Sequence, residues 1–376
     1  MYFAHLLPLG LVAYASAQSL GTILTQNNAT LSTLTSLLQL VPDVVQTLTT
    51  AQNVTILAPS DAAFTNLLSR NPRSAELMTN PRALTGVLQY HVLKGKLLST
   101  DFSATPEFPS TLLSTPFANV TGGQRLQLAL VNNTARVFSG YKQMASVVTP
   151  DLEFDGNNIL HIIDTVLTVP ATPLQTLLNT NLTSFAGALQ AVRLADGVNS
   201  LSDITLFAPS NDAFRAIGSA VGSSLSNNDL ANILGYHILL PGQAVRFSTD
   251  LLGADQMVLT TLQGGNLTVR RDGNQLFVNS ARVVLGDMVV ANGVVHVLDN
   301  VLNSSNTTAT PDPAAATQAP AFAGVSAVAD APFTSGIVPT TTLVPATVPL
   351  NEGGPFAVVP TGVMLAAGAA VLAAGM

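Results

Sequence analysis

The spacing of apolar residues predicts helices at the start of the chain's body and short strands after them. Between residues 31 and 48, leucine and valine recur three and four residues apart, the period of a helix with one buried face, and Pro42 interrupts the series. Runs rich in β-branched or aromatic residues predict strands. These runs are 54–57, 126–131, 204–207, 266–271 and 275–279. Predicted helices and predicted strands occur together within the same region of the chain, which predicts an α+β fold.

Three blocks of this pattern occur twice, in the same order. LAPSDAAF at 57–64 returns as FAPSNDAF at 207–214, LQYHVL at 88–93 as LGYHIL at 234–239, and NILHIIDTVL at 158–167 as GVVHVLDNVL at 293–302. The spacing shrinks from 150 to 146 to 135 residues, so the first copy carries about a dozen extra residues. Units of this length are self-sufficient domains, which predicts tandem domains at 19–170 and 173–303.

Each block predicts a local structure. In the first block a strand ends at proline, and Ser60 and Ser210 stand where a helix N-cap hydroxyl is expected, with Phe64 and Phe214 as core residues. In the second block a helix closes on Tyr-His and leads into a short strand. In the third block turn residues precede an apolar strand, which predicts a hairpin.

These residues resemble a known family. Three features are similar, in both copies, to the conserved boxes and central YH motif of the fasciclin-like (FAS1) domain family. They are the strand ending in APS-x-x-AF, the Tyr-His pair and the closing segment NG-x-x-HV-x-D-x-VL. Copy two is nearer the family pattern; copy one, with NNILHIIDTVL and the insertion, has less predictable loops. The resemblance implies two tandem domains, each a β-sheet wedge packed with α-helices, acting in cell adhesion or extracellular matrix, often on a GPI anchor.

The Tyr-His pairs allow two interpretations. The resemblance implies that Tyr90, His91, Tyr236 and His237 form a partner-binding site. The residues themselves fit side chains that pack and form hydrogen bonds at the centre of each domain.

No catalytic or metal site is expected. Apart from His5, the remaining histidines, His161 and His296, have an aspartate three residues on, which in a strand lies on the opposite face. No G-x-S-x-G, H-E-x-x-H or Walker motif occurs. His161 and His296 are therefore interpreted as hydrogen-bonding groups in an apolar strand, and no cofactor is predicted.

Amino-acid composition excludes further kinds of partner and site. Charged residues make up 9% of the 376 positions, the net charge is -7, and there is no cysteine. Scattered lysine and arginine give no basic stripe, which argues against nucleic acid as a partner. Without cysteine there is no disulfide framework or thiolate metal site, so the core must hold by burial alone.

Both ends of the chain resemble processing signals. Residues 1–17 predict a signal peptide with an Ala-Ser-Ala cleavage pattern, the alternative being an uncleaved anchor. Residues 352–376 predict a GPI-attachment propeptide with Asn351 as the attachment residue, or Gly353 instead. The alternative for the apolar tail is a membrane helix, but no cationic residue follows it.

The remaining segments predict glycosylation. Residues 304–351 are rich in Thr and Pro, which predicts an extended, O-glycosylated stalk, or a plain linker of the same geometry. N-glycosylation is expected at several sequons but doubted at Asn53, which directly precedes a strand expected to be buried. The candidates are Asn28, Asn119, Asn132, Asn181, Asn266, Asn303 and Asn306.

The sequence thus predicts a secreted, GPI-anchored glycoprotein of the cell surface or wall, acting in adhesion through tandem domains. Expected partners are cell-surface, wall or matrix components, with self-association as a further option and the membrane reached through the lipid anchor. The alternative is a wall-structural or polysaccharide-binding glycoprotein, and an enzyme is the third class considered.

Overall fold

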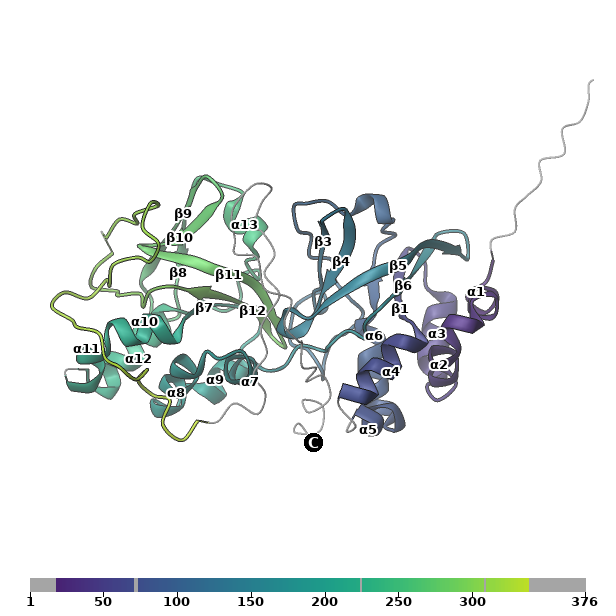
Figure 1. The fold of residues 1–376 in the computed structure, drawn as a ribbon, viewed down its shortest axis with the longest axis horizontal. Coiled ribbons are helices and arrows are strands. Elements are labelled where there is room, and N and C mark those ends of the chain that lie inside the picture. The colour runs from purple at the N-terminus through teal and green to yellow at the C-terminus, as the bar shows by residue number, and fades with distance from the viewer. Residues whose placement is uncertain (1–17, 71–73, 224, 308, 338–376) are drawn as a thin grey trace, which may run out of the picture.

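The computed structural model describes residues 18–70, 74–223, 225–307 and 309–337, and shows two units of the same construction side by side (Figure 1). Each unit has one six-stranded sheet, with most of its helices gathered on one side. The predicted α+β fold and the tandem arrangement are confirmed. The predicted signal peptide and the attachment residue Asn351 lie outside the described residues.

Domain 1 begins with helices and then interleaves them with its sheet. Its α-helices are α1 (Leu20–Gln26), α2 (Asn28–Leu38), α3 (Pro42–Thr50), α4 (Asp61–Arg70), α5 (Ser74–Thr79) and α6 (Pro81–Tyr90), with short 3₁₀ turns η1 (Ser99–Asp101) and η2 (Gly140–Lys142). Its strands are β1 (Val54–Pro59), β2 (Val92–Lys94), β3 (Gln127–Val131), β4 (Thr134–Phe138), β5 (Met144–Phe154) and β6 (Asn158–Ile163).

Domain 2 repeats this order. Its helices are α7 (Pro173–Asn179), α8 (Thr183–Ala191), α9 (Ala195–Ser200), α10 (Asn211–Ala216), α11 (Gly218–Ser223), α12 (Asn227–Tyr236) and α13 (Ser248–Leu252). Its strands are β7 (Ile204–Pro209), β8 (Gln256–Thr260), β9 (Asn266–Asp272), β10 (Gln275–Val278), β11 (Ala281–Val290) and β12 (Gly293–Leu298).

In each sheet the last strand lies beside the first. The orders are β2-β1-β6-β5-β4-β3 and β7-β12-β11-β10-β9-β8, with β1–β6 and β7–β12 parallel and the other pairs antiparallel. All four of these strands are buried along their whole length, as their unbroken apolar runs require. The third sequence block therefore lies against the first in both domains.

The local signals predicted for the first block are found where expected, whereas the short strand predicted after Tyr236-His237 is reduced to isolated bridges at Ile238 and Leu239. Ser60 Oγ accepts a hydrogen bond from Ala63 N at 3.2 Å, and Ser210 Oγ from Ala213 N at 3.1 Å, so both serines cap the helix that follows the strand. Phe64 and Phe214 are buried. At the β11–β12 turn, Gly293 has a φ of +157°, and a Cβ there would lie 1.9 Å from Ile204 O. Only glycine lets β12 approach β7 this closely.

Residues 309–337 differ from the predicted stalk. They form no helix or strand, but they lie along the outside of domain 2 (Figure 1). Arg282 donates to the carbonyls of Pro313, Ala315 and Ala316, and Phe333 packs edge-on against Phe214 with ring centroids 6.2 Å apart. This part of the predicted stalk therefore belongs to the folded body. Apolar residues among the prolines and threonines explain the difference, since they bury against α8 and α10.

Candidate functional site: the Tyr-His motifs and the cleft between the domains

The Tyr-His motif occupies the same position in both domains, where α6 and α12 end. All four side chains, those of Tyr90, His91, Tyr236 and His237, are at most 2% exposed. The partner-binding role implied by the family resemblance would need a surface that these side chains do not offer in this conformation. Their contacts instead match the alternative in which they pack and form hydrogen bonds within each domain.

The histidine of each motif joins a helix end to the end of the domain. His91 Nδ1 lies 2.7 Å from Val87 O, and Leu167 N donates to His91 Nε2 at 2.9 Å. Because Nε2 accepts, Nδ1 carries the proton and donates to the helix carbonyl. His237 repeats this arrangement with Ile233 O and Leu302 N. Burial lowers the pKa of both imidazoles to about 4, which keeps them neutral.

The tyrosine of each motif anchors a neighbouring strand or loop. Tyr90 donates its hydroxyl proton to Arg125 O at 3.2 Å, and Tyr236 donates to Asn266 O at 2.6 Å. Tyr236 also accepts a bond from Asn279 Nδ2 at 3.0 Å. The motif therefore acts as a hub between the helices and the far side of the sheet.

His161 and His296 form a second repeated arrangement, which sequence reasoning resolved only in part. His161 Nδ1 accepts from Asp151 N at 3.1 Å and its Nε2 donates to Leu97 O at 2.9 Å. His296 does the same with Asp287 N and Arg246 O. Both histidines are fully buried, and desolvation lowers the pKa of each. They are hydrogen-bonding groups of the strand, as interpreted from the sequence.

Each of these histidines sits beside a Ser-Asp pair that the sequence analysis missed. Asp151 and Asp287 stand at irregular points of β5 and β11 with φ near +60°. Their carboxylates accept from the backbone N–H and hydroxyl of Ser99 and Ser248, at 2.7 and 2.5 Å in domain 2. The signal that would have found the two serines, though not their aspartate partners, is the tripeptide Ser-Thr-Asp, which occurs at both 99–101 and 248–250.

This arrangement of serine, aspartate and histidine does not have hydrolase geometry. The serine hydroxyl donates to the carboxylate, and both nitrogens of the histidine are engaged with the backbone. Neither imidazole has a nitrogen free to take a proton from the serine, which a nucleophilic triad requires. Within the ranges that the structure describes, no three His, Asp or Glu side chains group together as metal ligands would.

The sequons differ in exposure. Five of the candidate asparagines are exposed, namely Asn28, Asn119, Asn132, Asn181 and Asn266. Asn303 and Asn306 are half-buried, and both donate from Nδ2 to Ala321 O, at 3.1 and 2.9 Å. Asn53 is also exposed, because the chain turns at a φ of +60° just before the buried strand. The lack of room expected at Asn53 is therefore not found.

The two domains meet in a hydrogen-bonded interface. Thr121 donates from its backbone N–H and its hydroxyl to the carboxylate of Asp203, at 2.7 and 2.6 Å. Gln124, 1% exposed, donates from Nε2 to Val290 O at 2.9 Å. The rings of Phe108 and Phe247 stack with centroids 4.1 Å apart. Both domains thus contribute side chains to one packed contact.

A buried cation faces this interface. Lys142 is 2% exposed, its ammonium donates to Gln127 Oε1, and its η2 turn contacts β11 of domain 2. Burial lowers the pKa of Lys142 to about 8, while the negative charge of Asp287 acts in the opposite direction. A charge from each domain is therefore shielded from solvent at the contact.

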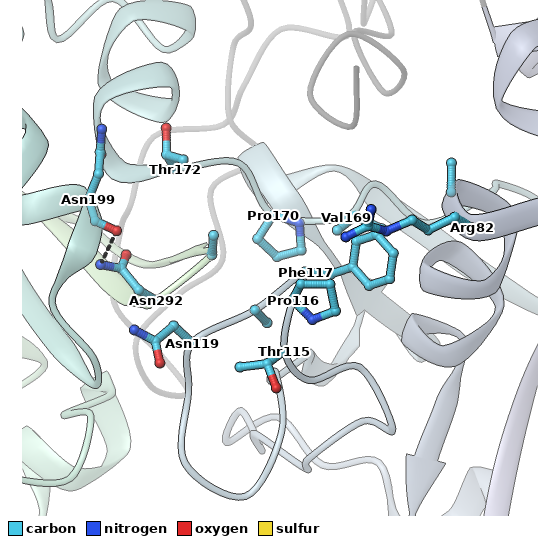
Figure 2. A pocket seen from close by; sticks show the side chains of 13 residues that line it. Arg82, Thr115, Pro116, Phe117, Asn119, Val169, Pro170, Thr172, Asn199 and Asn292 are labelled. Carbon is cyan, nitrogen blue, oxygen red and sulfur yellow. Dashed lines mark hydrogen bonds between the residues drawn. The ribbon is translucent and has the colours of Figure 1, made fainter. Parts of the chain in front are cut away.

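A pocket of about 290 Å³ opens beside this contact (Figure 2). Domain 1 supplies Arg82 from the start of α6 and the loop residues Pro116 and Phe117, whereas domain 2 supplies Asn199 and Asn292. Figure 2 shows Phe117 close to Arg82, and the two asparagines on the opposite wall. The pocket combines an aromatic ring, one cation and amide groups.

Across the described residues, no helix is long and apolar enough to span a bilayer.

Comparison with known proteins gives consistent results. The fasciclin domain profile matches residues 29–170 and 180–304. The chain is 36% identical over 317 residues to a fasciclin-like arabinogalactan protein of Arthroderma benhamiae, covering 84% of this chain and 74% of that protein. It is 30% identical over 304 residues to the fasciclin-like arabinogalactan protein elcF of Phaeosphaeria nodorum, covering 80% and 92%.

Two more distant similarities were found. Human periostin is 29% identical over 255 residues, which are 66% of this chain and 28% of periostin. The FAS1 domain pair of the insect cell adhesion molecule fasciclin I aligns with a TM-score of 0.36 at 20% identity, over 73% of this chain and 98% of that one.

The helices α1 and α7 precede the ranges matched by the fasciclin domain profile, yet Leu20 and Leu177 belong to the domain cores.

Proposed function

Since this chain belongs to the fasciclin domain family and carries the domain twice, we propose that it is an adhesion protein of the cell surface, matrix or wall. The observation that carries the proposal is the packed interface between the domains, with Asp203 and Phe247 of domain 2 held by Thr121 and Phe108 of domain 1. A fixed pair presents two binding faces at constant spacing, so weak contacts to a repetitive surface add up without the entropy of a flexible tether.

The contacts on which adhesion depends lie on the outer surface of the domains and not at the Tyr-His motifs. The motif side chains are buried and already bonded within each domain, so they support the binding surface from inside. The chain has few charged residues, so the outer surface of the two domains favours neutral, polar partners such as glycosylated proteins or polysaccharides.

Display at the cell surface follows from the two terminal signals. Cleavage after Ala17 would secrete the chain, and transfer of Asn351 to a GPI anchor would attach it to the membrane. A phosphatidylinositol-specific phospholipase should then release the protein from intact cells into the medium. Retention in the membrane fraction after digestion would contradict the anchor.

Adhesion is tested by cell aggregation. Cells that display the full chain should aggregate more than cells that display a truncation beginning at residue 304, at equal surface density. Equal aggregation by the two would contradict a role of the domains in adhesion.

The second candidate function is wall-structural or polysaccharide binding. The pocket between the domains favours it, because an aromatic ring and several amides face one another there. Binding of the enzymatically deglycosylated protein to a glycan array would support this candidate, whereas self-association without glycan binding would support adhesion alone.

A further inference from the structure

The pocket between the domains carries a chemistry that the adhesion proposal does not use. Its walls come from both domains, so it exists only while the interface is formed. Its volume of about 290 Å³ is near the lower end of the range of about 300–1,000 Å³ typical of small-molecule sites. That size suits one or two sugar rings.

One wall presents a buried acceptor without a donor. Asn292 is 1% exposed, and its Nδ2 donates to the carbonyls of Val198 and Leu201 of domain 2, at 2.8 and 2.7 Å. Its Oδ1 has no hydrogen-bond partner among the described residues, although it is buried. An unpaired buried carbonyl is unfavourable, and a donor on a ligand would satisfy it once the Asn292 amide turns toward the pocket that it lines. The donor that fits is a hydroxyl group.

The opposite wall presents an apolar ring. Phe117 packs over α6 at Gly86, where an added Cβ would lie 3.1 Å from the ring. Glycine at this point lets the ring lie close to the helix, with Pro116 beside it at the pocket (Figure 2). Such a ring offers a flat surface of about the size of a sugar's C–H face, and apolar contact with it excludes water.

The pocket also holds one unmatched cation. Arg82 is exposed, and within the described ranges its guanidinium has no hydrogen-bond or ion-pair partner, while neither Asp nor Glu lines the pocket. Guanidinium groups bind carboxylates through two parallel hydrogen bonds. An acidic group on the ligand would therefore complete the site.

From these three features we infer that the pocket between the domains binds an acidic sugar ring, a uronic acid unit of an oligosaccharide. Hydroxyl groups donate to Asn292 Oδ1, the C–H face lies on Phe117, and the carboxylate is bound by Arg82. The inference goes beyond adhesion and stands without it. Because the ligand touches both domains, its binding also stabilises their contact.

The test is calorimetric titration of the purified full chain with an oligogalacturonate and, separately, with a neutral β-glucan hexasaccharide. The expected result is that the oligogalacturonate binds about tenfold more tightly than the neutral probe, because only its carboxylate can pair with the Arg82 guanidinium. Equal affinity for both probes, or binding of neither, would overturn the inference.

Variants separate the pocket from the rest of the surface. Arg82→Gln should remove the preference for the acidic probe without changing the melting temperature, and Ala291→Phe should abolish binding of both probes by filling the pocket. Arg70→Gln, at an exposed arginine on α4 outside the pocket, is the matched control and should bind as the parent does. Unchanged preference in Arg82→Gln would overturn the assignment of the carboxylate.

The same variants keep this inference distinct from the proposed function. Aggregation that persists in Arg82→Gln together with lost acidic preference leaves adhesion in place and supports the pocket. Acidic oligosaccharide binding without aggregation by the parent protein would contradict adhesion and still support the pocket.

Discussion

Each domain contains two buried histidines, all of them neutral because every ring nitrogen is committed to the backbone. His91 and His237 join the end of a helix to the final residues of their domain. His161 and His296 bond to the strand beside them and to a preceding loop. Protonating any one of them would put a second proton where a backbone N–H already donates. The histidines therefore make folding sensitive to acid.

Stability should fall between about pH 6.5 and pH 4. For His91 and His237 the pKa drops from 6.5 in the unfolded chain to about 4 in the folded one, so the unfolded chain binds more protons in this window. Each group contributes roughly 3 kcal/mol above pH 6.5 that is lost on acidification. Asp299, whose pKa burial raises, acts in the opposite sense. Urea unfolding at pH 7 and pH 4.5 measures the difference.

The control for this effect is His91→Gln, which removes one titrating group. Its unfolding free energy should be lower at pH 7 but vary less with pH than that of the parent. Equal pH dependence of the two proteins would show that His91 does not titrate as its burial requires.

The sequon at Asn119 should carry no glycan. Asn119 Nδ2 donates weakly to Ser200 O and Leu201 O across the interface, and Thr121 of the same sequon is bonded to Asp203. A glycan on Nδ2 would separate the domains at this point. Glycopeptide mass spectrometry should find Asn119 bare and Asn132, exposed at the β3–β4 turn, occupied. A fully occupied Asn119 would contradict the interface.

At the scale of elements, the strands and hairpins of the repeated blocks followed from local sequence, whereas β4, β8 and the C-terminal segment did not. The strand-Pro-Ser block predicted β1 with α4 and β7 with α10, because caps and apolar runs act over a few residues. Residues 309–337 have no such period. They pack because domain 2 presents a small residue there, Gly187 of α8, where domain 1 has Ser36. The two positions correspond because each lies three residues after Thr33 or Ser184, whose backbone N–H groups donate to the first residue of α4 and of α10, respectively.

Replacing Gly187 with serine should therefore detach the segment. A Cβ at Gly187 would lie 2.0 Å from Phe333 O and 2.6 Å from Ile337 Cδ1, so the segment must move away. Overpacking of this kind costs about 1–3 kcal/mol. Hydrogen exchange of residues 325–337 should become faster in Gly187→Ser.

The matched control is Gly197→Ala in α9, where an added Cβ would meet no atom within 4 Å. Alanine in a helix is more favourable than glycine, so this variant should be as stable as the parent or slightly more stable. Unchanged exchange in Gly187→Ser would mean that the segment does not lie on α8 in solution.

For the whole molecule, the interface is what the sequence could not predict. It is made by residues from loops of both domains, such as Phe108, Thr121 and Asp203, which have no period and no motif. The spacing between copies falls from 146 residues at the second block to 135 at the third, so most of the extra residues of copy one lie between these two blocks, and the loop that contains Phe108 and Thr121 lies in that interval. Their length was visible in the sequence, but their packing against domain 2 was not.

The two domains should unfold together. Calorimetry of the parent protein should show one transition, because separating the domains exposes the Phe108–Phe247 stack and leaves Lys142 and Asp287 without their surroundings. The double variant Phe108→Ala, Asp203→Asn should show two transitions. Leu40→Ala, at an apolar residue that is 53% exposed, is the control and should keep one. Two transitions in the parent would contradict a rigid pair.

The C-terminal segment also determines how the molecule would respond to mechanical load. A pull on the chain beyond residue 337 reaches Phe333 and Val328 before it reaches the strands of domain 2. Val328 N bonds to Arg215 O, and Ser326 N to Ser219 Oγ, so these contacts would break one after another while the sheet stays intact. Stepwise detachment would release up to about 30 residues of extended chain, which would take up part of the load before it reaches the folded domains.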